Sequence, residues 1–138
     1  MPQLAPSWLA LEEGLGGTRP VLRGQAKEMR AQVDQLVQML LPLYPPPSEN
    51  VEVQQGEADG IGYRIYTPKG NKGGLPLAIW THGGGFMTGD LNSDHLLCCI
   101  VSEQTNSAVV NIDYRLTPEY KTPLEDSWKV YKWVSHST

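Results

Sequence analysis

Three successive glycines, Gly83, Gly84 and Gly85, follow a histidine and the apolar run at 75–80. Glycine has no Cβ and adopts positive φ without cost, so the backbone N–H groups of such a run are open to a ligand. Backbone N–H groups aimed at one point stabilise the oxyanion that develops during acyl transfer. The spacing therefore predicts an oxyanion hole at the exit of a buried strand. The competing interpretation is a tight turn that needs glycine only for its dihedral angles.

A hydrolytic site also needs a nucleophile. No serine of the chain lies in a G-x-S-x-G pattern, which presents a serine on a sharp turn between a strand and a helix; the serines are Ser7, Ser48, Ser93, Ser102, Ser107, Ser127, Ser135 and Ser137. His82 is therefore not interpreted as a general base, because a base needs a nucleophile within hydrogen-bond reach. We expect its ring to hold the glycine loop in shape through a hydrogen bond.

The composition is that of one globular domain. The chain has 138 residues, of which 40% are hydrophobic and 19% charged, enough for a single core. A formal charge of −4 argues against a nucleic-acid partner. No apolar run approaches the roughly 20 residues of a membrane span, and the first residues lack the basic and apolar regions of a signal peptide. We expect a cytoplasmic protein without a membrane span.

Cys98 and Cys99 are adjacent. A bridge between neighbours in a helix would be strained, and no cysteine or histidine stands at the spacing of a zinc site. We interpret the pair as small core residues and expect neither a metal nor a cofactor.

Helical patterns fill the first third of the chain. Residues 7–13 read as a short helix capped by Ser7 and ended by Gly14. Between 21 and 41 apolar residues recur at helical spacing; they are Leu22, Ala26, Met29, Val33, Leu36, Val37, Leu40 and Leu41. Pro42 and the prolines at 45–47 end this amphipathic helix.

The centre of the chain has strand patterns. Residues 51–53 and 61–66 alternate with period two, and Gly56 and Asp59-Gly60 supply turn chemistry for an antiparallel hairpin. The apolar run at 75–80 is typical of a strand buried on both faces.

A βαβ unit follows, with a helix capped by Asn92 or Ser93 that runs to about Asn106, and a second buried strand at 108–114. Thr122-Pro123-Leu124-Glu125 reads as a capping box with proline at N1. It starts a final helix, which reaches about Ser135 and carries three large residues on one face: Leu124, Trp128 and Tyr131.

With these elements placed, the chain resembles the hormone-sensitive-lipase-like branch of the α/β-hydrolases. The resemblance rests on His82-Gly83-Gly84-Gly85-Phe86, on Gly89-Asp90, on the D-Y-R-L-T-P-E sequence at 113–119 and on P-L-E-D-S-W at 123–128. It covers roughly residues 50–136, and the helix at 21–41 looks like the N-terminal cap of that family.

The resemblance implies a partial α/β-hydrolase fold: a mixed, mostly parallel sheet flanked by helices, with residues 1–48 as a helical cap segment and 49–138 as the N-terminal part of the core. It implies hydrolysis of a small-molecule carboxylic ester through a serine acyl-enzyme. The chain order of the triad in this fold is serine, acid, histidine. The acidic residues and histidines of this chain all come before any such serine; they include His82, His95, His136, Asp113, Glu119, Glu125 and Asp126.

Other residues receive structural interpretations. Asp113, Arg115 and Glu119 follow the second buried strand, and we interpret them as an ion pair or loop clamp built on Arg115 rather than as catalytic acids. Four large aromatic residues are assigned to core or hairpin packing: Tyr63, Tyr66, Trp80 and Trp128.

Two other function classes stay open. A glycine-rich loop after a strand can cradle phosphate, but the loop has neither G-x-x-x-x-G-K-[ST] nor G-x-G-x-x-G, so nucleotide binding is much the weaker hypothesis. The second alternative is a non-catalytic module, a pseudoenzyme that binds an acyl ligand or a partner chain.

Finally, we expect four strands, two antiparallel and then two parallel, with helices on both faces and the 21–41 helix as a lid. The 75–80 strand would be an unpaired edge, which favours self-association. We expect the product to be cut short of a full hydrolase and inactive by itself.

Overall fold

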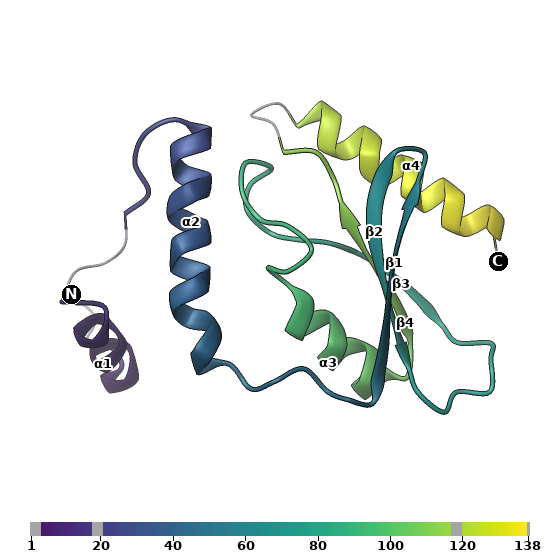
Figure 1. Cartoon of the computed structure of the whole chain (residues 1–138), viewed down its shortest axis with the longest axis horizontal. Helices are drawn as coiled ribbons and strands as arrows, with labels where there is room; N and C mark the ends of the chain where they lie inside the picture. The colour runs from purple at the N-terminus through teal and green to yellow at the C-terminus, as the bar shows by residue number, and fades with distance from the viewer. Residues whose placement is uncertain (1–3, 18–20, 117–119, 138) are drawn as a thin grey trace.

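A computed structural model describes residues 4–17, 21–116 and 120–137. Two helices come first, α1 (Pro6–Gly14) and α2 (Ala26–Leu40), followed by the single 3₁₀ turn η1 (Leu41–Leu43). The remaining elements in chain order are β1 (Val51–Ala58), β2 (Ile61–Pro68), β3 (Leu77–Thr81), α3 (His95–Thr105), β4 (Ala108–Asp113) and α4 (Lys121–Ser137). Figure 1 shows α3 and α4 on opposite sides of one sheet, with α2 and α1 beside it.

The sheet is mixed and has the strand order β1-β2-β4-β3. β1 pairs with β2 and β2 with β4 in antiparallel fashion, whereas β3 and β4 are parallel. The β1–β2 hairpin turns on Asp59 (φ 51°) and Gly60 (φ 77°), the two positive φ values that a type I′ turn requires. The predicted four-stranded mixed sheet and its hairpin are confirmed, but the sheet is not mostly parallel among the described residues, because two of its three strand pairings are antiparallel. Gly56 lies within β1 opposite Tyr63 rather than in the turn.

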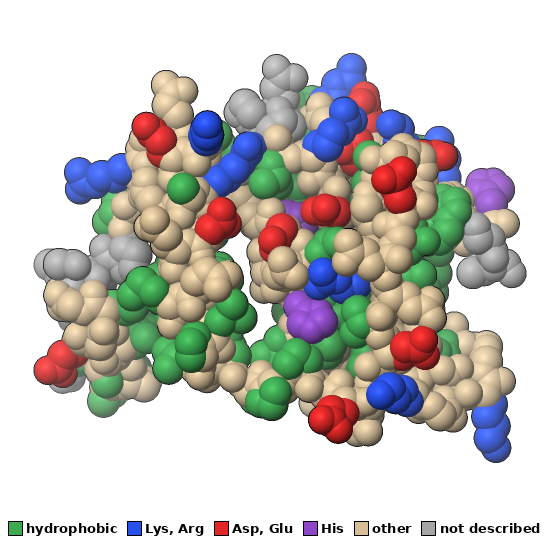
Figure 2. All heavy atoms as spheres, viewed as in Figure 1, with side chains coloured by type: hydrophobic (Ala, Val, Ile, Leu, Met, Phe, Trp, Pro, Cys, Tyr) green, Lys and Arg blue, Asp and Glu red, His purple; other side chains and the backbone are tan. Residues whose placement is uncertain are grey.

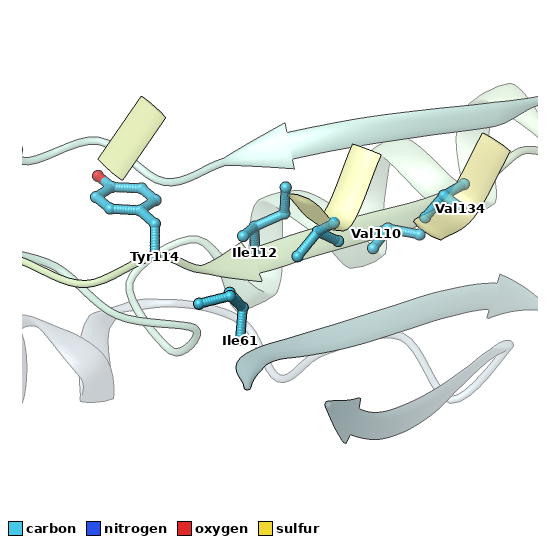
Figure 3. Close-up of a cluster of buried hydrophobic side chains, with 6 residues drawn as sticks. Ile61, Val110, Ile112, Tyr114 and Val134 are labelled. Atoms are coloured by element: carbon cyan, nitrogen blue, oxygen red, sulfur yellow. The ribbon is translucent and has the colours of Figure 1, made fainter. Parts of the chain in front are cut away.

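Each face of the sheet has its own hydrophobic core. Towards α4, side chains from β2 and β4 pack against the buried Val130 and Val134, as Figure 3 shows for this cluster. Towards α3, the buried Cys98 and Cys99 pack against Tyr66 and Val109. Because neighbouring residues of a strand point to opposite faces, Val109 and Val110 of β4 serve different cores. Both cysteines are free and buried, which confirms their interpretation as core residues.

Helix boundaries differ from the sequence-based expectations where caps were misassigned. α1 begins at Pro6 after Ala5, so Ser7 is not its cap. α2 begins at Ala26 and not at 21, because Gln25 and Glu28 form a reciprocal capping box there. α3 begins at His95 after Asp94; Asn92 and Ser93 instead donate their backbone N–H groups to Asp90.

α4 begins one residue before Thr122, and its first intrahelical bond runs from the Leu124 N–H to the Tyr120 carbonyl. The face predicted to be apolar is exposed: the exposed fractions of Leu124 and Trp128 are 62% and 56%. The helix packs through Pro123, Asp126, Val130 and Val134, which are buried. The prediction that Trp128 is a packing residue is therefore wrong; its ring instead stacks on Tyr131 with centroids 5.0 Å apart.

β3 is less buried than its apolar sequence suggested. Leu77 is 42% exposed and the three residues after it are half-buried. The reason is that β3 is an edge strand among the described residues, paired with β4 on one side. The expected edge position of this strand is thus confirmed.

Candidate functional site

The glycine loop leaves the sheet at the carboxyl end of β3 and turns sharply at Gly84. The Gly84 carbonyl accepts hydrogen bonds from the backbone N–H groups of Met87 and Thr88, each at 3.1 Å, and from the Thr88 hydroxyl at 3.1 Å. Gly84 and Gly85 have φ values of +123° and +59°. A Cβ on Gly84 would collide with the Thr88 carbonyl, so the turn itself requires glycine there.

The three glycines differ in what their backbone N–H groups do. All three residues are exposed. The Gly83 N–H donates to Oδ2 of Asp94 at 3.4 Å, whereas those of Gly84 and Gly85 have no hydrogen-bond partner in the described part of the chain. Solvent-facing N–H groups without a protein acceptor can stabilise an anion.

His82 lies beneath this loop and is 3% exposed. Its Nδ1 is 2.9 Å from the Gly83 carbonyl oxygen and 3.2 Å from the Tyr114 hydroxyl, which itself donates to the His82 carbonyl at 2.7 Å. The His82 and Tyr114 rings stack with centroids 4.2 Å apart. A hydroxyl has one proton, so with that proton on the carbonyl bond, Nδ1 is the donor towards Gly83. The ring thereby ties the start of the loop to the end of β4.

The Asp94 side chain also contacts the glycine loop. Its Oδ2 accepts from Trp80 Nε1 at 2.9 Å as well as from the Gly83 N–H. One carboxylate oxygen thus joins β3, the glycine loop and the start of α3.

Arg115 and Asp126 form the clamp near the end of β4. Arg115 Nε and Nη2 donate to the two carboxylate oxygens of Asp126 at 2.8 and 2.7 Å, and the Arg115 N–H adds a third bond at 3.0 Å. These hydrogen bonds hold the pKa of Asp126 below its usual range. The clamp exists as expected on Arg115, but its acid is Asp126 and not Asp113; Glu119 lies outside the described residues.

Two side chains near the site have raised pKa values because they are shielded from water. Shielding raises the pKa of Asp113, opposed by the charge of His82. Burial raises the pKa of the Cys98 thiol to about 12, which leaves it protonated and unreactive.

A separate polar group lies between the sheet and α3. The Tyr66 hydroxyl is 3.1 Å from His95 Nδ1, and Arg64 donates to the Asn92 side chain and to the Leu91 carbonyl at 3.2 Å. Desolvation and the Arg64 charge lower the pKa of His95. This group does not touch the glycines.

A hydrogen bond from Arg30 Nε to the Met87 carbonyl, at 2.5 Å, links α2 to the glycine loop. Near the C-terminal end of α2, a cavity of about 710 Å³ lies between that helix, the proline run at 45–47 and α3. Figure 2 shows this furrow, with hydrophobic side chains on both sides of its lower part. Its polar end includes Asp94 and His95.

Among the described residues no cluster of side chains could hold a metal ion, and no helix is long and apolar enough to cross a membrane. The structure brings His82 and the three glycines together as one loop. It adds three residues that pattern reasoning missed, Asp94, Tyr114 and Arg30. Asp94 was missed because a cap at Asn92 or Ser93 places it within the expected helix, whereas α3 begins only at His95.

The chain has clear relatives. Residues 78–138 match a family described as alpha/beta hydrolase fold. The versiconal hemiacetal acetate esterase of Dothistroma septosporum is 56% identical over 135 residues, which are 96% of this chain and 41% of that protein. The enzyme of the same name from Aspergillus parasiticus is 33% identical over 94% of this chain and 43% of its own length. The chain thus spans less than half the length of these two relatives.

Solved structures of esterases also superpose on this chain. A hyperthermophilic esterase from Pyrobaculum calidifontis superposes with a TM-score of 0.78 at 27% identity, covering 99% of this chain and 44% of its own. An ester hydrolase from the metagenome of Lake Arreo superposes with a TM-score of 0.80 at 28% identity, covering 98% and 46%.

Proposed function

The chain belongs to the alpha/beta hydrolase family, and we propose that it forms the N-terminal part of a serine carboxylic-ester hydrolase. In this proposal it contributes the oxyanion-hole loop, with Gly83, Gly84 and Gly85 as the candidate donors and His82 as the residue that shapes the loop. The nucleophile, the acid and the catalytic histidine would come from residues beyond these 138.

The observation that carries the proposal is that Gly84 and Gly85, two exposed residues at the carboxyl end of β3, have backbone N–H groups without a hydrogen-bond partner in the described part of the chain. The loop after the third strand is where lipases and esterases of this fold supply one half of the oxyanion hole. The other half is the N–H group of the residue that follows the nucleophile. These 138 residues contain no G-x-S-x-G pattern that would supply that nucleophile.

A carboxylic ester is the substrate class that we propose. Two relatives are named as esterases of a hemiacetal acetate, so an acetate ester is the first probe to use. On this proposal the isolated chain binds and orients but does not turn over an ester, because no residue of it attacks the carbonyl.

The test is a chimera in which this chain replaces the matching segment of the Dothistroma esterase. We expect the chimera to hydrolyse an acetate ester. Gly84→Ala should lower kcat/KM by about 10²–10³, the typical cost of losing an oxyanion donor, because a Cβ at this position displaces the turn.

Gly14→Ala is the matched control, since a Cβ there meets nothing within 4 Å and the position lies in α1. It should leave kcat/KM unchanged. A folded chimera that retains full activity with Gly84→Ala would contradict the oxyanion role. A folded chimera without any activity would instead favour the non-catalytic module.

A further inference from the structure

We propose that Asp94 is a positioning residue, whose carboxylate holds the Gly83 N–H so that Gly84 and Gly85 alone supply the free donors of the loop. The importance of Asp94 for catalysis rests on the proposed esterase function. The hydrogen bonds from which its positioning role is argued do not depend on that function.

The first argument is the use that the structure makes of this carboxylate. Asp94 is the residue before α3, where an aspartate ordinarily accepts from the first N–H groups of the helix, yet it makes no side-chain capping bond. Its Oδ2 points back to β3 and the loop, to Trp80 Nε1 at 2.9 Å and the Gly83 N–H at 3.4 Å. The side chain therefore leaves the start of α3 uncapped and contacts the loop instead.

The second argument concerns the donors. A backbone N–H has a single proton, and that of Gly83 is directed at a carboxylate. It is therefore engaged before any substrate oxyanion arrives. The Gly84 and Gly85 N–H groups lie beyond this anchor, in a turn fixed by the three bonds to the Gly84 carbonyl. Asp94 thus decides which glycines donate.

Several titratable groups surround this carboxylate. Burial raises the pKa of Cys98, on the same helix, and of Tyr114, after β4, and the negative charge of Asp94 adds to both effects. His95 adjoins it in sequence, and its pKa is lowered by desolvation and by Arg64. Asp90 is the other carboxylate of the loop; burial acts to raise its pKa, but the hydrogen bonds from Asn92 and Ser93 together outweigh it and lower this pKa. Comparison of Asp94→Asn with Asp90→Asn therefore distinguishes the effects of the two carboxylates.

The experiment is NMR of the ¹⁵N-labelled chain at neutral pH, in which Asp94→Asn is compared with the wild type. In Asp94→Asn the Gly83 amide and the Trp80 indole N–H resonances should both shift, because they lose their common charged acceptor. The Gly84 and Gly85 amide resonances should shift as well. Hydrogen exchange of the Gly83 amide should become about tenfold faster, because a bond to a charged acceptor is lost.

Asp90→Asn is the matched control, because Asp90 accepts from Asn92 and Ser93 and contacts no glycine N–H. It should leave the Gly83 and Trp80 resonances and the exchange rate of the Gly83 amide in place. Should Asp94→Asn fail to fold, Trp80→Phe keeps the carboxylate, and the slow exchange of the Gly83 amide should persist. A Gly83 amide whose exchange is unchanged in Asp94→Asn, or Gly84 and Gly85 resonances that do not respond to this variant, would overturn the inference.

The two proposals fail separately. These signals come from the isolated chain and need no turnover. An inactive chimera together with the expected faster exchange of Gly83 in Asp94→Asn rejects the esterase function and keeps the anchoring role of Asp94. An active chimera without that change in exchange does the reverse.

Discussion

Arg115 and Asp126 join the end of β4 to the first turns of α4. The Asp126 side chain is fully buried, whereas 62% of the Arg115 side chain is exposed. A buried carboxylate that loses its partner keeps its desolvation cost without compensation. This ion pair therefore matters more for folding than an exposed pair would.

We predict that Arg115→Met lowers the free energy of unfolding by about 2 kcal/mol, the range for a hydrogen bond to a charged group. Urea denaturation measures this. Lys121→Met is the control, because Lys121 and Glu125 form an exposed pair at 3.9 Å, and it should change stability by less than about 1 kcal/mol. An equal effect of both variants would contradict the role of the buried clamp.

The same ion pair predicts a pH dependence. The pKa of Asp126 is lowered in the folded chain, first by the hydrogen bonds from Arg115. A lowered carboxylate pKa stabilises the fold above the unfolded-state pKa, and this stabilisation is lost as the pH falls through the folded-state pKa. The stability difference between wild type and Arg115→Met should therefore be full at neutral pH and shrink in acid. A difference that stays constant down to the acid-unfolding range would refute this.

At the scale of elements, α2 has no fully buried residue. The apolar stripe that the sequence predicted for this helix is half-buried, and the Arg30 side chain donates a hydrogen bond to the Met87 carbonyl of the loop. Elements with few buried contacts open locally at low free energy. The function of α2 as a lid stays a prediction.

We predict that Arg30→Met increases hydrogen exchange along α2 by about tenfold, because one charge-assisted bond is lost. Global stability should change by less than about 1 kcal/mol. Lys27→Met, an exposed position on the same helix, should leave the exchange unchanged. Exchange that does not respond to Arg30→Met would show that other contacts hold α2.

β3 lies at the edge of the sheet, and one of its sides has no partner among the described strands. Unpaired edges pair with other chains unless charge or proline blocks them. We expect the chain to associate as its concentration rises, measured by sedimentation velocity. Leu77→Lys, at a position that is 42% exposed, should reduce this association with little change in stability. A wild-type chain that stays monomeric at all concentrations would contradict the prediction.

At the scale of the whole molecule, the proposed role of the chain is to carry the oxyanion-hole loop of a hydrolytic site on part of a sheet. We predict that the isolated protein hydrolyses no short-chain chromogenic ester and takes up no fluorophosphonate label, because none of its serines lies in a nucleophile turn. The chimera described above is the positive control. Stoichiometric labelling of any serine in this chain would contradict the assignment.

The sequence alone determined the features that depend on local periodicity and turn chemistry. The hairpin at Asp59-Gly60, the buried β4, the glycine loop and the amphipathic α2 follow from spacings that each segment carries by itself. The family followed as well, because the H-G-G-G-F and D-Y-R-L-T-P-E motifs are contiguous in the chain.

Only the tertiary structure decided which groups meet. Asp126 rather than Asp113 pairs with Arg115, and Asp94 serves the glycine loop rather than its own helix. Leu124, Trp128 and Tyr131 are exposed because α4 turns a different face to the sheet, the one that carries Val130, Trp133 and Val134. Such choices depend on distances between segments far apart in sequence. A local pattern states what a side chain can bind, and only the packed fold states which partner lies within reach.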